Sequence, residues 1–65
     1  MNTKTIFSVQ YNGSRYQVRE ISYSSYFVRY DILQDRRVIK SGKFWSRRSA
    51  ILELLQILRL NVIQS

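Results

Sequence analysis

The side chains best suited to chemistry in this 65-residue chain are its arginines, because the sequence contains neither histidine nor cysteine. Without an imidazole or a thiol, the chain lacks the usual general base, the usual thiol nucleophile and the best zinc ligands. Its carboxylates are scattered along the sequence: Glu20, Asp31, Asp35 and Glu53. We therefore expect no catalytic residue, no metal site and no cofactor, and we predict a non-enzymatic protein.

The balance of charge favours a polyanionic partner. Eight arginines and three lysines oppose four acidic residues, which leaves a net charge of +7. The excess of arginine favours recognition over mere solubility, because a guanidinium binds phosphate and guanine through two parallel hydrogen bonds. We predict an accessory or regulatory nucleic-acid-binding module, with double-stranded DNA as the favoured target. The alternatives are a protein-interaction or inhibitory module that docks on an acidic protein, and a binder of single-stranded DNA or RNA.

A first group of basic residues is expected on one face of an N-terminal hairpin. The Asn12-Gly13 pair fits the two positive φ values of a type I′ turn. The register that follows pairs Tyr11 with Ser14, Val9 with Tyr16 and Phe7 with Val18 on an apolar face, and Gln10 with Arg15, Ser8 with Gln17 and Ile6 with Arg19 on a polar face. Polar side chains on a sheet can enter a major groove, where arginine reads guanine and glutamine reads adenine. The candidates for this surface are Arg15, Gln17, Arg19 and Arg29.

A second group of basic residues is expected where a fourth strand leads into a C-terminal helix. Ser46 suits the helix N-cap, and Arg47 and Arg48 then oppose the helix dipole at a cost of about 0.3–1 kcal/mol each. A phosphate held by the free N–H groups of the helix start would offset that cost. The candidates for this surface are Lys40, Lys43, Arg47 and Arg48.

Aromatic residues should supply much of the core, since the chain has five tyrosines, three phenylalanines and one tryptophan. We expect most of these rings inside: Phe7, Tyr11, Tyr16, Tyr26, Tyr30, Phe44 and Trp45. Tyr23 and Phe27 are the exceptions, because they fall in a polar connector and on the basic side of the following strand. These two rings are candidates for stacking on unpaired bases.

These groups need a scaffold, and the pattern of the chain predicts an α+β fold in a single domain, residues 1–65. The hairpin is followed by a third strand over 26–33, a turn over 34–37 and a fourth strand over 38–45, whose inward face the pattern does not assign. A C-terminal helix over 47–60 carries an apolar stripe: Ile51, Leu54, Leu55, Leu58 and Val62. We predict an antiparallel sheet of three to four strands packed on this one helix.

Apolar residues away from that stripe raise the question of self-association. Leu52, Leu60 and Ile63 project from the other side of the helix, which is more apolar surface than a small monomer needs to expose. We expect either a homodimer contact through these residues or a plain overhang at the helix end.

The hydropathy pattern predicts a soluble, cytoplasmic protein without a membrane partner. No apolar run approaches the roughly 20 residues of a membrane span. The first residues, Met1-Asn2-Thr3-Lys4, also lack the apolar region of a signal peptide.

The segment 26–55, YFVRYDILQDRRVIKSGKFWSRRSAILELL, resembles AP2-type plant DNA-binding domains and the N-terminal arm-binding domains of phage-type integrases. The shared features are an aromatic-rich strand, a charged turn, a strand that ends in Gly-x-Phe, a polar cap and an Ala-containing helix. In those families the exposed face of a three-stranded sheet lies in the major groove. The resemblance implies that the counterparts of the groove-facing residues are Arg15, Arg19, Arg29 and Lys40.

Overall fold

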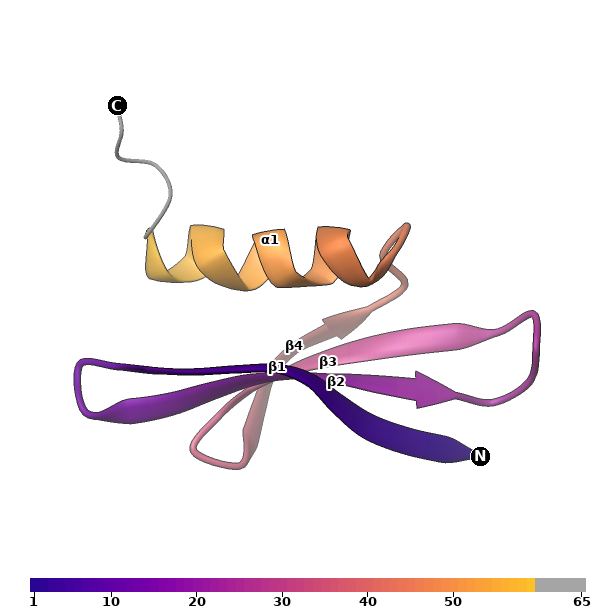
Figure 1. Cartoon of the computed structure of the whole chain (residues 1–65), viewed down its shortest axis with the longest axis horizontal. Helices are drawn as coiled ribbons and strands as arrows, with labels where there is room; N and C mark the ends of the chain where they lie inside the picture. The colour runs from indigo at the N-terminus through magenta and orange to yellow at the C-terminus, as the bar shows by residue number, and fades with distance from the viewer. Residues whose placement is uncertain (60–65) are drawn as a thin grey trace.

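Four strands and one helix follow one another in the computed structural model, which describes residues 1–59 (Figure 1). The elements are β1 (Asn2–Tyr11), β2 (Ser14–Ser22), β3 (Val28–Gln34), β4 (Arg37–Gly42) and α1 (Arg47–Leu58). The strands form one antiparallel sheet in the order β1-β2-β3-β4, and α1 lies across one face of it. The predicted α+β fold is confirmed. Leu60, Val62 and Ile63, which belong to the expected stripe and dimer contact, lie outside the described residues.

Two tight turns with left-handed backbone set the register of the sheet. Asn12 and Gly13 have φ values of 52° and 80°, which confirms the type I′ turn predicted between β1 and β2. Asp35 and Arg36, between β3 and β4, also have positive φ values, of 48° and 73°. Both hairpins therefore close through two residues, although the second one has an arginine where glycine is easier to place.

The predicted β1–β2 register is confirmed from the turn as far as the Phe7–Val18 pair, and it is wrong beyond that pair. Thr5 lies opposite Arg19, because the register shifts between Thr5 and Phe7. Ile6 is the extra residue, and it packs against the core instead of facing Arg19. A bulge of this kind lets neighbouring apolar residues of one strand turn toward the same side.

The core lies between the sheet and α1. Its buried residues are Val18, Tyr30, Ile32, Ala50, Leu54 and Leu58. The expectation that Leu54 and Leu58 lie inside is confirmed, and Ala50 joins them one turn earlier on the same face. Ser46 caps the helix as predicted, since its side chain accepts a hydrogen bond from the Ser49 N–H. The helix ends at Leu58, two residues earlier than predicted, because Arg59 adopts a left-handed conformation with a φ of 59°.

The third strand begins at Val28, later than the predicted 26–33, because a serine closes the preceding loop. The Ser24 hydroxyl accepts hydrogen bonds from the N–H groups of Tyr26 and Phe27, both at 3.2 Å. Tyr26 consequently lies outside the sheet with 95% of its surface exposed, and its expected place in the core is wrong.

The fourth strand also ends before the predicted limit of 38–45. The chain leaves the sheet after Gly42 to reach the helix, and Phe44 packs against the core with its ring 6.3 Å from that of Tyr30. Trp45 is the next residue and is 97% exposed, so the expectation of a core tryptophan is wrong. One core position was available at this point of the chain, and Phe44 fills it.

The pairing of β4 with β3 assigns the faces that the sequence pattern left open. Lys40 lies opposite the buried Ile32 and therefore on the side of α1. Ser41 lies opposite Asp31 and Val38 opposite Leu33, on the other side. Ile39 is an extra residue between the Ile32–Lys40 and Leu33–Val38 pairs, so the register of β4 shifts there.

Candidate nucleic-acid interface

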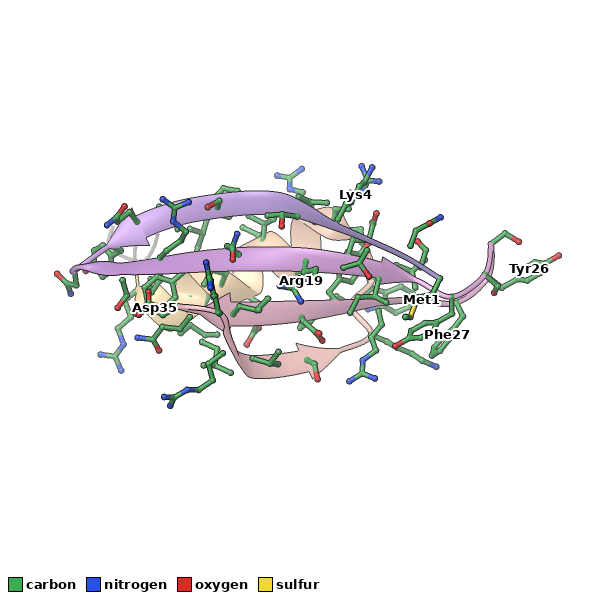
Figure 2. The ribbon with its side chains drawn as sticks, turned by 90° about the horizontal axis from the view of Figure 1, so that it is seen from below. Met1, Lys4, Arg19, Tyr26, Phe27 and Asp35 are labelled. Carbon is green, nitrogen blue, oxygen red and sulfur yellow. The ribbon has the colours of Figure 1, made fainter. Side chains whose placement is uncertain are left out.

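We call the side of the sheet opposite α1 the outer face, and Figure 2 looks directly onto it, with Arg19 near its middle and α1 behind the sheet. Strand pairing gives this face its charged members from the two central strands: Arg15, Arg19, Arg29 and Asp31. Gln17 lies between the two arginines of β2 on the same face. The whole predicted row of Arg15, Gln17, Arg19 and Arg29 therefore lies on one surface.

Arg15 is fixed in place through its backbone by the β3–β4 turn. Its N–H donates to Asp35 Oδ1 at 3.0 Å, and the Asp35 N–H donates to the Arg15 carbonyl at 2.8 Å. The hydrogen bond from the Arg15 N–H, followed by one from Ser14, lowers the pKa of Asp35 below its ordinary value. The Asp35 carboxylate is thus occupied by backbone, and the Arg15 guanidinium extends from an anchored position.

The same end of the outer face contains a polar hollow of about 400 Å³. It is lined by Arg15, Gln17, Asp35 and Arg36. Arg36 was not among the residues singled out from the sequence, because a turn residue gives no periodic signal of the face that it joins. Two guanidinium groups beside an amide form a suitable environment for a phosphate oxygen.

The middle of the outer face contains polar groups that the fold does not satisfy. Arg19 lies opposite Asp31, which offsets part of its charge. Arg29 Nη2 donates to Ser41 Oγ at 2.9 Å. Within residues 1–59, however, the enclosed Arg29 Nε and Asp31 Oδ1 atoms have no hydrogen-bond partner. Enclosed polar atoms in folded proteins normally have a partner, so these two atoms are exceptions in the middle of the outer face.

Leu33 shows that the outer face is closely covered by its own side chains. It belongs to this face, opposite Gln17 and Val38, yet only 1% of its surface is exposed. Because α1 lies on the other side of the sheet, the side chains around Leu33 on the outer face must shield it. Long polar side chains can do this with their aliphatic stems while their charged ends stay in water.

Arg47, from the second predicted group, is directed toward the protein instead. Its Nε and Nη2 donate to the two oxygens of Glu20 at 2.8 and 3.0 Å, and Glu20 is only 8% exposed. The Tyr30 hydroxyl donates to Glu20 Oε2 at 2.9 Å. A cation at a helix start is unfavourable unless an anion lies nearby. The sequence argument expected a phosphate there, and in this structure the anion is the Glu20 carboxylate of β2.

These contacts shift the titration of all three groups. The pKa of Glu20 lies below its ordinary value, mainly because Arg47 donates hydrogen bonds to its charged form and despite burial, which acts the other way. Burial, followed by the hydrogen bond to Glu20, raises the pKa of Tyr30. The same Glu20 contact raises the pKa of Arg47. The three groups therefore form one coupled network that joins α1 to β2 and β3.

The other members of the second group have separate positions. Lys40 forms an ion pair with Glu53 of α1 and faces the helix, so it does not share the outer face with the arginines. Lys43 lies with its Nζ 4.6 Å from the centre of the Phe27 ring. Among residues 1–59, neither Lys43 nor Arg48 forms an ion pair with a carboxylate.

The rings expected to stack on bases stack on each other. The Tyr23 and Phe27 ring centres are 5.0 Å apart with an interplanar angle of 26°, and the two residues are 43% and 38% exposed. The more exposed rings are Tyr26 and Trp45, which the sequence pattern placed in the core.

Comparisons with known proteins supply no relative for this arrangement: no family model, curated protein or solved structure matches the chain. Within the described residues, no group of three or more acidic, histidine or cysteine side chains is arranged to hold a metal ion. Over the same range, no helix is both long and apolar enough to cross a membrane.

Proposed function

We propose that this protein is a non-enzymatic module that binds double-stranded DNA through its outer face. The observation that supports the proposal most directly is the row of arginines that strand pairing places on the outer face, apart from the ion pairs of the helix side. Glu20 and Glu53 pair with Arg47 and Lys40 on the helix side, whereas within residues 1–59 the outer-face residues Arg15, Arg19 and Arg29 form no ion pair with a carboxylate. The charge of these three arginines is therefore not neutralised by an ion pair within the described part of the fold.

The dimensions of the sheet favour a groove as the binding place. The outer-face arginines come from β2 and β3, the two central strands. Neighbouring strands lie about 4.8 Å apart, so a pair of strands fits a major groove about 12 Å wide. The edge strands β1 and β4 would then lie against the two phosphate backbones, where Gln10, Ser8 and Ser41 can donate hydrogen bonds.

Residues on one face of a strand recur about every 6.6 Å, which lets Arg15 and Arg19 reach different base pairs with Gln17 between them. Arginine to guanine and glutamine to adenine are the pairings that geometry favours in the major groove. The resemblance to AP2-type domains points to the same surface for three of its four implied residues, Arg15, Arg19 and Arg29. Lys40 is excluded from the proposed interface because it faces α1.

The experiment that tests the proposal is a salt titration of binding to a labelled mixed-sequence duplex. On a mixed-sequence duplex each guanidinium is expected to contact a phosphate, so Arg15→Ala with Arg19→Ala should make the slope of log K against log salt shallower by about two. The matched control is Arg37→Ala with Arg59→Gly, which removes the same charge from exposed positions outside the outer face while glycine keeps the left-handed cap.

The control should leave the salt slope within about half a unit of the wild-type value, because its charges lie outside the interface. Equal changes of the salt slope in the two double variants would mean that binding depends only on the net charge of the protein, and would overturn the assignment of the outer face. Failure of the wild-type protein to bind any duplex would favour the acidic protein partner as the ligand of this surface.

A further inference from the structure

One end of the molecule carries rings that neither the core nor the outer face uses. We call Tyr23, Tyr26, Phe27, Lys43 and Trp45 the aromatic end. They come from the β2–β3 loop and from the connection between β4 and α1, which lie at the same end of the sheet in Figure 1. Figure 2 shows Tyr26 and Phe27 beyond the strands at this end.

The exposure of these rings is unusual for so small a protein. Tyr26 and Trp45 are 95% and 97% exposed, while much smaller side chains such as Ala50 fill the core. Single exposed apolar residues need no explanation, but several large rings gathered at one place mark a binding surface.

The two segments are held together and held in shape. Lys43 from the β4–α1 connection lies over the Phe27 ring of the β2–β3 loop, and Phe27 stacks on Tyr23. The Ser24 hydroxyl fixes the backbone of the same loop. The exposed rings of Tyr26 and Trp45 therefore project from an ordered base, which lowers the entropy that a ligand must overcome on binding.

We propose that the aromatic end binds unpaired nucleobases next to a duplex, with Tyr26 and Trp45 as the stacking rings. This inference rests on the proposed function and names a further part of the ligand. Flat rings beside a cation match a base and its phosphate, because every base offers a π-face and Lys43 offers the charge. Arg29 lies two residues after Phe27 and belongs to the outer face, so the two surfaces are continuous at this point.

A lipid surface is the other ligand class that attracts aromatic and basic residues. The residues of the aromatic end favour bases, because its apolar groups are planar rings without branched aliphatic side chains and serines 24 and 25 lie among them. The experiment below separates the two classes.

The test uses three labelled duplexes: a blunt duplex, the same duplex with an overhang of about 8 thymidines, and the same duplex with an abasic overhang of equal length. The two overhangs carry the same phosphate charge and differ only in their bases. The thymidine overhang should bind about tenfold more tightly than the abasic one, and Tyr26→Ala or Trp45→Ala should remove that difference. Tyr26→Phe, which keeps the ring, should preserve it.

Trp45 supplies a second readout, because it is the sole tryptophan of the chain. Its fluorescence should be quenched by the thymidine overhang and unchanged by the abasic one. Equal binding of the two overhangs, with the blunt duplex still bound, would overturn this inference and leave the proposed function intact. A blue shift of Trp45 emission on zwitterionic vesicles, without quenching by thymidines, would assign the surface to a membrane and also overturn it. Absence of binding to the blunt duplex would instead count against the proposed function itself.

Discussion

Arg47, at the start of α1, and Arg19, on β2, lie on opposite sides of the sheet, and their surroundings differ in kind. The guanidinium of Arg47 is held by both oxygens of the nearly buried Glu20, which in turn accepts a hydrogen bond from Tyr30. Arg19 lies on the outer face, where it is partly buried, with Asp31 opposite it and further arginines nearby. The comparison teaches that net charge does not identify a binding residue in a basic protein. The position of the few carboxylates decides which cations form ion pairs within the fold and, among residues 1–59, which do not.

The largest expected effect is a loss of stability from a substitution in the core on the helix side of the sheet. Leu54 is fully buried in the core, so Leu54→Ala should lower the free energy of unfolding by about 2–5 kcal/mol, measured by urea denaturation. Leu52 is 42% exposed on the same helix and provides the control, with an expected loss well under 1 kcal/mol for Leu52→Ala. The reverse order of the two losses would mean that the helix presents its other face to the sheet.

Glu20→Gln tests the ion pair of the helix side. The substitution should cost about 1–3 kcal/mol near neutral pH, because it removes a charged hydrogen-bond acceptor from Arg47 and Tyr30. Since folding lowers the pKa of Glu20, its contribution is present above the ordinary carboxyl pKa and is lost as the pH falls through the folded value. Below about pH 4, the stability of the wild type should therefore decline more steeply than that of Glu20→Gln. Thermal melting of both proteins over a range of pH measures this difference.

Glu53→Gln is the natural comparison for Glu20→Gln, since its partner Lys40 has a half-exposed side chain. It should cost less than about 1 kcal/mol, as exposed ion pairs generally do. Parallel pH profiles for wild type and Glu20→Gln would show that the Glu20 network contributes no pH-dependent stability.

The turn that sets the outer face in register is expected to have an effect between those of Glu20→Gln and Glu53→Gln. Gly13 has a φ of 80° and no atom within 4 Å of the place where a Cβ would stand, so only backbone conformation opposes a side chain there. Gly13→Val should lose about 1–2 kcal/mol, read from the shift in thermal midpoint. An unchanged midpoint would mean that this turn does not determine the β1–β2 pairing.

The smallest effect is an expected gain in stability. Arg36 has a φ of 73°, which glycine adopts without strain, so Arg36→Gly should raise the free energy of unfolding by about 0.5–1 kcal/mol. The same variant should weaken duplex binding if the hollow beside Arg15 holds a phosphate. A gain in stability without any loss of binding would restrict the interface to the strands.

The hairpin and the helix could be predicted because their signals are local. Asn12-Gly13 specifies its own turn, and Ser46 with the spacing of Leu54 and Leu58 specifies where a helix begins and which side it buries. The row from Arg15 to Arg19 followed directly from that turn, because alternation along a strand fixes the face of each residue.

The missed features depend on contacts that are distant in sequence or on competition for space. The Arg47–Glu20 pair joins residues that are 27 positions apart, so spacing along the chain gives no sign of it. The place of Trp45 depended on Phe44 occupying the position beside Tyr30. The bulge at Ile6 redirected a predicted partner of Arg19, and the strand pattern alone contains no marker for such an insertion.

The most direct test of the central claim compares Arg19→Ala with Arg47→Ala for both stability and duplex affinity. Arg19→Ala should leave the free energy of unfolding within about 0.5 kcal/mol and weaken binding to a preferred duplex by about 1–3 kcal/mol. Arg47→Ala should lower the free energy of unfolding by more than Arg19→Ala does, because it leaves the nearly buried Glu20 carboxylate without its cation, and the protein that remains folded should bind with close to wild-type affinity. The opposite result, in which Arg47→Ala abolishes binding by a stable protein and Arg19→Ala has no effect on binding, would contradict the account.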